Sequence, residues 1–110
     1  MYKQGEILIV PFPFSDLSNI KQRPVIVLSK AEDNEISEDI ITCGLTSNLK
    51  NSAHSVLIDN INLEEGSIPK KSRIKVDKLF TINKNSIKKK VARLNKKTFE
   101  EVKKEFINLI

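Results

Sequence analysis

The chain has 110 residues, a length typical of one domain, and its 39% hydrophobic and 30% charged residues are typical of a soluble globular protein. No apolar run approaches the roughly 20 residues that span a bilayer, and no secretory signal is visible, so no membrane partner and a cytoplasmic location are expected. The net charge of +5 is unevenly spread: residues 1–68 hold five Lys/Arg against ten Asp/Glu, and residues 69–110 hold fourteen against four. This asymmetry indicates either an anionic partner, nucleic acid or acidic protein, or a lysine-rich solvated surface.

The N-terminal segment predicts a strand followed by a loop. Residues 5–14 are rich in β-branched and aromatic side chains. Pro11 and Pro13 remove two backbone donors, which indicates an edge or a bulge towards the end of this strand. The polar residues 15–22 are typical of a loop.

A proline begins the second predicted strand. Pro24 disfavours helical backbone at Arg23 and is tolerated at a strand start, so residues 25–29 are expected to be extended, with Arg23 at the entrance. Residues 31–39 are acidic and polar, which predicts a loop.

Residues 40–47 alternate and predict a third strand. Ile41, Cys43 and Leu45 are expected on one face, with Thr42, Gly44 and Thr46 on the other. Cys43 is the only cysteine, so it has no intrachain disulfide partner, and its neighbours favour a buried core residue over a nucleophile.

The next segments predict two more strands. Residues 55–59 are short and apolar, and the polar residues 60–71 are typical of turns. Residues 72–77 alternate, which places Lys75 and Asp77 on the same side of a strand with Cβ atoms ~6.5 Å apart. Residues 82–94 are expected to be strand in part.

The period becomes helical after Asn95. Apolar residues then recur three or four apart and predict an amphipathic helix packed on a sheet. They are Phe99, Val102, Phe106, Leu109 and Ile110. Either Asn95, or Thr98 with Glu101 as a capping box, is expected to start this helix.

The residue inventory excludes the common cofactor and metal sites. Three glycines do not make a glycine-rich phosphate loop, and one histidine with one cysteine does not make a zinc cluster. No cofactor and no metal site are therefore predicted. A Ser-His-Asp triad exists on paper through His54, but a lone surface histidine is more often a bystander than a base.

Four residues at strand ends or on polar strand faces could cleave RNA: Arg23, Thr46, Lys75 and Asp77. Arginine can stabilise a phosphorane with two parallel hydrogen bonds, and threonine can donate one to a phosphate oxygen. Asp77 is a candidate base, although the neighbouring Lys75 would favour its ionised form and weaken it. The structural alternatives are an Arg23 ion pair with Asp16 or Glu6, a threonine that only ends a strand, and an exposed ion pair.

Four sequence blocks resemble the MazF/PemK toxin family in order and spacing, across nearly the whole chain. They are residues 5–17 (GEILIVPFPFSDL), 21–29 (KQRPVIVLS), 45–48 (LTSN) and 76–82 (VDKLFTI). The resemblance implies a mainly β fold, a small SH3-like barrel of the MazF/PemK/CcdB type with a C-terminal helix, as a single domain over residues 1–110.

The same resemblance implies a function. Such toxins are homodimeric mRNA interferases that cut single-stranded RNA at specific sequences without metal, through 2′-hydroxyl attack that leaves a 2′,3′-cyclic phosphate. A cognate acidic antitoxin inhibits them and joins them in DNA binding. The basic C-terminal part of the chain suits both anionic ligands.

The resemblance also assigns site residues. The family's catalytic arginine falls on Arg23 and its catalytic threonine on Thr46. In the PemK branch an arginine and an aspartate two residues apart act as acid and base, and here these positions are Lys75 and Asp77. A lysine is a point charge rather than a fork, so the acid differs in kind.

The polar ends of these blocks supply the RNA-binding candidates, which are Asp16, Lys21, Ser47, Asn48 and Lys50. Two other functions stay open. A CcdB-like poison of DNA gyrase would bind its target through the C-terminal helix and would not need Arg23 or Thr46. A catalytically inactive RNA-binding barrel would bind RNA with a steep salt dependence and leave it intact.

Overall fold

A computed structural model of the chain describes residues 2–13 and 20–110. The strands are β1 (Glu6–Pro13), β2 (Ile20–Val27), β3 (Asp39–Thr46), β4 (Ser55–Ile58), β5 (Leu63–Gly66), β6 (Ser72–Asn83) and β7 (Lys89–Leu94). The helices are α1 (Ala31–Ile36) and α2 (Lys96–Leu109), with single 3-10 turns at η1 (Asn60–Asn62) and η2 (Lys84–Ser86).

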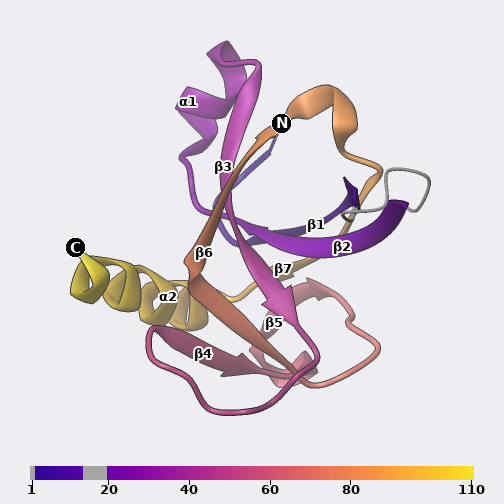
Figure 1. Cartoon of the computed structure of the whole chain (residues 1–110). Coiled ribbons are helices and arrows are strands. Elements are labelled where there is room, and N and C mark those ends of the chain that lie inside the picture. Colours follow the sequence, from indigo (N-terminus) through magenta and orange to yellow (C-terminus); the bar gives the residue numbers. More distant parts are fainter. Residues whose placement is uncertain (1, 14–19) are drawn as a thin grey trace.

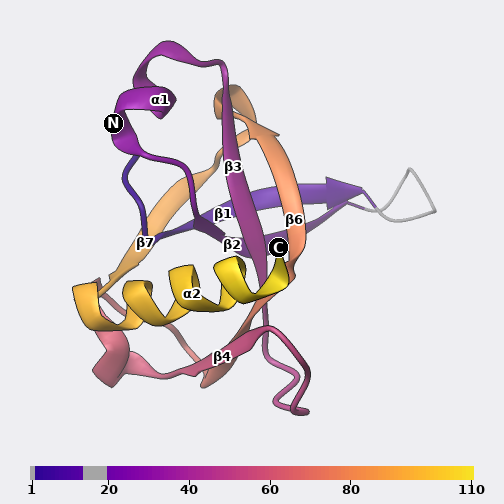
Figure 2. The same ribbon diagram turned by 90° about the vertical axis from the view of Figure 1, so that its left-hand side faces the viewer.

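The strands form one curled antiparallel sheet in the order β4-β6-β3-β2-β1-β7-β5. Figure 1 shows β6, in orange, bending near its middle, so that its two halves belong to different parts of the sheet. Figure 2 shows α2 lying across one side, beside β4. The predicted mainly β fold with a C-terminal helix is confirmed, and an SH3-like barrel describes it roughly.

Apolar side chains pack on both faces of the central strands. Ile7, Ile26 and Cys43 are paired across β1, β2 and β3 and belong to a cluster that includes Val102 of α2. Leu8 on the opposite face of β1 belongs to a second cluster, together with its partner on β2. Because both faces are covered, apolar residues run almost continuously through these strands.

The predicted faces of β3 agree with its register, but both faces carry buried residues. Cys43 and Leu45 belong to the first cluster, and Thr42 lies on the other face, opposite Val27 of the second cluster. Thr42 is fully buried, and its hydroxyl donates a hydrogen bond to the Phe80 carbonyl at 3.0 Å, which satisfies it inside the protein. Facing away from the first cluster therefore does not mean facing solvent, whereas Ile41, on the face of Cys43, is 50% exposed.

The start of β2 was also predicted wrongly. The strand begins at Ile20 and not at Val25, so Arg23 lies within the strand, opposite Val10 of β1, and not at its entrance. The prolines of β1 are placed as predicted. The ladder between β1 and β7 ends at Ile9, so the residues beyond it pair on one side only.

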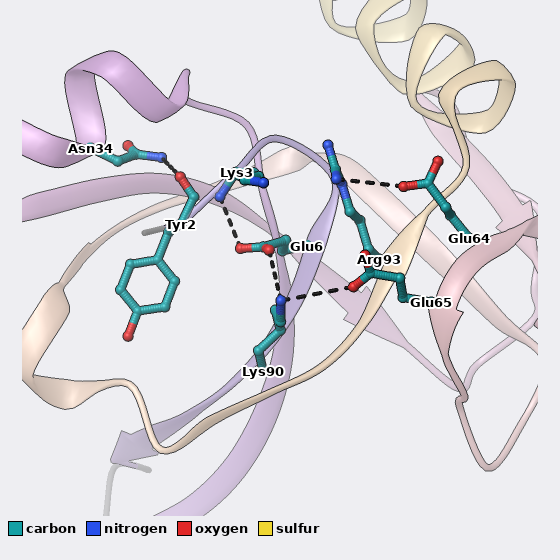
Figure 3. Close-up of polar contacts among 8 residues, drawn as sticks. All are labelled: Tyr2, Lys3, Glu6, Asn34, Glu64, Glu65, Lys90 and Arg93. Carbon is teal, nitrogen blue, oxygen red and sulfur yellow. Dashed lines mark hydrogen bonds and ion pairs between the residues drawn. The ribbon is translucent and has the colours of Figure 1, made fainter.

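Two expected loops contain regular structure. Residues 31–36 form α1, whose only buried residue is Asn34. The Asn34 side chain donates a hydrogen bond to the Tyr2 carbonyl (Figure 3) and another to the Ser29 carbonyl, so polar contacts rather than an apolar face hold this helix. Within the expected turns of residues 60–71, residues 63–66 form β5, a short edge strand that pairs only with β7.

Helix α2 begins at the first of its two predicted caps. The Asn95 side chain accepts a hydrogen bond from the Thr98 backbone N–H at 2.8 Å. Val102 is fully buried, as predicted, but Ile110 is 85% exposed because the helix ends at Leu109.

A buried carboxylate ties β1 to β7 (Figure 3). Glu6 is 2% exposed and accepts hydrogen bonds from the Lys3 backbone N–H at 2.8 Å and from Lys90 Nζ at 3.1 Å. The bond to Glu6 raises the pKa of the Lys90 ammonium. Across residues 2–13 and 20–110, neither helix is long and apolar enough to cross a membrane.

Candidate nucleic-acid-cleaving site

Arg23 and Thr46 project from the same face of neighbouring strands. The ladder between β2 and β3 ends at the pair Val25–Gly44. Arg23 lies two residues before Val25, and Thr46 lies two residues after Gly44. Because a step of two along a strand keeps a side chain on one face, both side chains share the face of this last pair, beyond the end of the ladder.

An open cavity of about 570 Å³ collects five of the nine predicted site residues. They are Arg23, Thr46, Asn48, Lys50 and Lys75. Its volume lies within the ~300–1,000 Å³ of typical ligand pockets. The residues come from β2, β3, the loop after β3 and β6, so the cavity exists only in the folded chain.

The loop after β3 orients Thr46. The Thr46 Oγ1 accepts a hydrogen bond from the Asn48 backbone N–H at 3.1 Å, and Asn48 Oδ1 accepts one from the Lys50 N–H at 3.1 Å. A hydroxyl that accepts such a bond still has its own proton to donate. Thr46 can therefore offer a hydrogen bond to an anionic oxygen in the cavity.

A bulge in β6 shapes the opposite wall. Gly44 of β3 pairs with Lys75, but its neighbour Cys43 pairs with Leu79, so residues 76–78 have no partners on β3. Lys75 lines the cavity and donates a hydrogen bond to Ser52 Oγ at 2.7 Å. The alternation predicted for residues 72–77 is confirmed in their burial, because Ser72, Ile74 and Val76 are buried and the residues between them are not.

Asp77 differs from Lys75 in its relation to the cavity. Lys78 and Phe80, beyond Asp77, join Lys75 in lining the cavity, while Asp77 is exposed and is not among the described lining residues. Burial, and then the Asp77 carboxylate, raise the pKa of the Cys43 thiol to about 12. Of the predicted acid and base, Lys75 lines the cavity, and Asp77 is not among the described lining residues.

The remaining predicted RNA-binding residues are Ser47, Lys21 and Asp16, and none of them is among the described residues that line this cavity. Ser47 lines a second, smaller cavity of about 240 Å³, which shares Arg23 and Thr46 with the first. Lys21 is exposed and lies opposite Phe12 in the β1–β2 ladder. Asp16 lies outside the described residues.

An aromatic pair in the cavity was missed by the sequence analysis. The rings of Phe12 and Phe80 are tilted by 46° with centroids 4.8 Å apart, and both residues line the cavity. Phe12 pairs with Lys21 and so shares the face of Arg23, two residues along β2, a signal that the register supplies. Phe80 had no comparable signal, because a bulge brings it to the cavity, and Ser52 was signalled only by its place in the polar loop of residues 49–54.

His54 and Cys43 lie outside this arrangement. His54 has a positive φ of 54° and its Nδ1 lies 3.6 Å from Glu105 of α2. Its carbonyl accepts a hydrogen bond from the Val76 N–H at 3.0 Å. Cys43 is fully buried, as predicted. Among the described residues, no group of three or more His, Cys, Asp or Glu could hold a metal ion.

The cavity combines groups that can bind a phosphodiester and stabilise its charge. Arg23, Lys50, Lys75 and Lys78 supply positive charge, and Thr46 supplies a hydroxyl donor. Such donors stabilise charge that develops on a phosphate during reaction. The aromatic rings offer faces on which an unpaired nucleobase can stack.

One known protein family matches nearly the whole chain. A family model described as "PemK-like, MazF-like toxin of type II toxin-antitoxin system" matches residues 3–110. Search of the curated proteins found no match.

Solved toxin structures share the fold. MazE-MazF from Deinococcus radiodurans has a TM-score of 0.79 at 19% identity, covering 98% of this chain and 94% of that one. An endoribonuclease with its cognate antitoxin from Mycobacterial species has a TM-score of 0.77 at 15% identity, covering 98% and 93%. Mycobacterium tuberculosis toxin MazF-mt6 has a TM-score of 0.75 at 17% identity, covering 94% and 93%.

Proposed function

Because the chain belongs to the PemK-like, MazF-like toxins of type II toxin-antitoxin systems, we propose that it is an endoribonuclease that cuts single-stranded RNA at specific sequences without a metal ion. The observation that carries this proposal is the convergence of Arg23, Thr46 and Lys75 on one cavity. These residues come from three separate strands. Without a shared function, they would not be expected to converge on one cavity.

The reaction would be an internal transesterification. The 2′-oxygen attacks the adjacent phosphorus, the bond from phosphorus to the 5′-oxygen breaks, and the products carry a 2′,3′-cyclic phosphate and a 5′-hydroxyl. Arg23 would bind two non-bridging oxygens as charge accumulates on them, and Thr46 would donate to one of them. These contacts strengthen in the transition state and so accelerate the chemical step.

We assign proton transfer to two residues of β6, Lys75 and Asp77. Lys75 would protonate the leaving 5′-oxygen or hold the phosphate in place, and Asp77 would accept the 2′-hydroxyl proton. Lys75 lines the cavity, and Asp77, two residues further along the strand, is exposed and is not among the described lining residues. Asp77 would therefore meet the RNA from beside the cavity.

Single-stranded RNA fits the cavity better than a duplex. Phe12 and Phe80 offer ring faces that stack only with unpaired bases. The side-chain amides of Asn48 and Asn51 line the same cavity and can hydrogen-bond base edges. We assign sequence preference to these groups, with Ser47 and Lys21 at the margin.

The proposed partner is a cognate antitoxin with an acidic segment that occupies the same cationic cavity and so excludes RNA. One solved structure with this fold is an endoribonuclease in complex with its cognate antitoxin. We further propose that the protein acts as a homodimer on cytoplasmic mRNA.

The test is cleavage of a long single-stranded RNA in EDTA. Wild-type protein is expected to produce discrete fragments, and Arg23→Ala to slow cleavage about 100-fold or more, since one oxyanion donor is worth about 10²–10³ in rate. Thr46→Val is expected to be slow and Thr46→Ser, which keeps the hydroxyl, close to wild type. Thermal melts check that each variant is folded. Intact RNA with folded wild-type protein, or equal cleavage by Arg23→Ala, contradicts the proposal.

A further inference from the structure

Two cations of β6 are tied to the start of β4 and the loop before it by a row of two serine hydroxyls. Lys75 Nζ donates to Ser52 Oγ at 2.7 Å, and Ser52 Oγ lies 3.4 Å from Ser55 Oγ. Ser55 Oγ accepts from the Arg73 guanidinium at 3.0 Å and donates to the Ser52 carbonyl at 2.6 Å. The row of hydroxyls therefore runs from one cation to the other.

The two cations, Lys75 and Arg73, determine the directions of these hydrogen bonds. Lysine and arginine only donate, so each serine must accept from the cation that it meets. The Ser52 proton then points to Ser55, and the Ser55 proton points to the Ser52 carbonyl. Each hydroxyl both accepts and donates, and no two donors face each other.

The register of the strands explains why these serine hydroxyls matter for the cavity. Lys75 lies opposite Gly44 on β3 and opposite Ser55 on β4. Both Ser52 and Lys75 line the cavity with Thr46. Ser52 is half-buried, and Ser55 holds both its carbonyl and its hydroxyl. Ser52, which accepts the hydrogen bond from Lys75, is thus held in place by Ser55.

We propose that Ser52 is a positioning residue: its hydroxyl holds the Lys75 ammonium at the reacting phosphate, and the contact between Ser55 and Arg73 holds Ser52. This inference rests on the proposed nuclease function. A lysine stem has four rotatable bonds, so an ammonium without an acceptor samples many positions. Misplacing a reacting group by about 1 Å can cost up to 10²-fold in rate.

Cleavage by the Ser52→Ala variant is the first measurement. Its kcat is expected to fall about 5- to 20-fold with KM nearly unchanged, and Ser52→Thr, which keeps the hydroxyl, is expected to recover most of the rate. Ser86→Ala is a matched control, because that hydroxyl bonds only the Asn83 carbonyl of its own turn among the described contacts. Equal losses in Ser52→Ala and Ser52→Thr would overturn the inference.

A double-mutant cycle with Lys75→Gln isolates the coupling. If Ser52 acts through Lys75, Ser52→Ala has little further effect once Lys75 is replaced. If Ser52→Ala slows the Lys75→Gln protein by the same factor as wild type, Ser52 acts independently and the inference is wrong.

A readout without RNA separates this inference from the proposed function. In NMR relaxation of the RNA-free protein, the Lys75 side-chain nitrogen and terminal carbon are expected to be ordered in wild type and Ser52→Thr, and mobile in Ser52→Ala. Absence of RNA cleavage by wild type with an ordered Lys75 would refute the nuclease proposal and retain the positioning contact. A mobile Lys75 in wild type would refute the positioning role whatever the RNA result.

Discussion

Burial governs the chemistry of the single cysteine. The Cys43 side chain is fully inside the apolar cluster between the sheet and α2. A thiolate there would lose its hydration, and the Asp77 carboxylate would repel it, so the pKa of the Cys43 thiol rises to about 12 from 9.0. Cys43 is consequently a core residue and not a nucleophile.

This burial predicts a loss of stability in alkali. Above pH 9.0 the unfolded thiol ionises while the folded thiol stays protonated until about pH 12, so the free energy of unfolding falls as pH rises between these values. The loss is about 2 kcal/mol midway through this interval. Denaturant titrations across the interval measure it. The Cys43→Ala variant should lack this component, and an identical pH dependence in both proteins would contradict the assignment.

The candidate residues show where a sequence is informative about a site. Arg23 and Thr46 could be predicted because each stands beside an apolar run that ends in polar groups, and both line the cavity. Asp77 was placed with Lys75 by the alternation of residues 72–77, which their burial follows, but Asp77 is not among the described lining residues where the bulge in β6 begins. Ser52 and Phe80 reach the cavity through that bulge and a loop, and no periodic pattern in the chain encodes either feature.

At the scale of elements, α2 depends on one side chain at its start. Asn95 accepts a hydrogen bond from the Thr98 N–H, one of the backbone donors that lack a partner in the first turn. Asn95→Ala is therefore expected to lower the free energy of unfolding by about 1 kcal/mol, and Asn95→Ser to retain most of it. Urea denaturation measures both. Asn108→Ala, exposed in the last turn, is the matched control. Equal losses at both ends would show that capping is not the cause.

Elements with a strong periodic signal could be predicted, and the others could not. The alternating or apolar runs of β1, β3 and the first half of β6 stand out in the sequence, as does the apolar face of α2. Helix α1 has no apolar face, since its one buried side chain is the amide of Asn34. Strand β5 is four residues long and mostly exposed. Tertiary contacts rather than local pattern define these two.

At the scale of the whole molecule, cations from both halves of the chain meet in one cavity. Arg23 and Lys50 come from residues 1–68, which are acidic overall, and Lys75 and Lys78 come from residues 69–110, which are basic overall. The charge around the cavity is thus more positive than the net negative charge of residues 1–68 suggests.

This clustering predicts a salt dependence for RNA binding. Four cations on phosphates would make the slope of log K against log salt about −3 for a single strand. Binding of an RNA that carries 2′-deoxy linkages, which resists cleavage, measures this slope. Lys78→Gln is expected to reduce it by about 0.7, whereas Lys103→Gln, on the exposed face of α2, should leave it unchanged. Equal changes in both variants would indicate a diffuse charge effect.

The central claim is that the 2′-hydroxyl of RNA attacks a phosphate bound in this cavity. Its most direct test is an oligonucleotide with one 2′-deoxynucleotide immediately 5′ of the bond that the protein cuts, incubated in EDTA and analysed by mass spectrometry beside the all-RNA strand. We expect the all-RNA strand to give a 2′,3′-cyclic phosphate and a 5′-hydroxyl, and the substituted bond to remain intact. Cleavage at the substituted bond, or products with a 5′-phosphate, would contradict the mechanism.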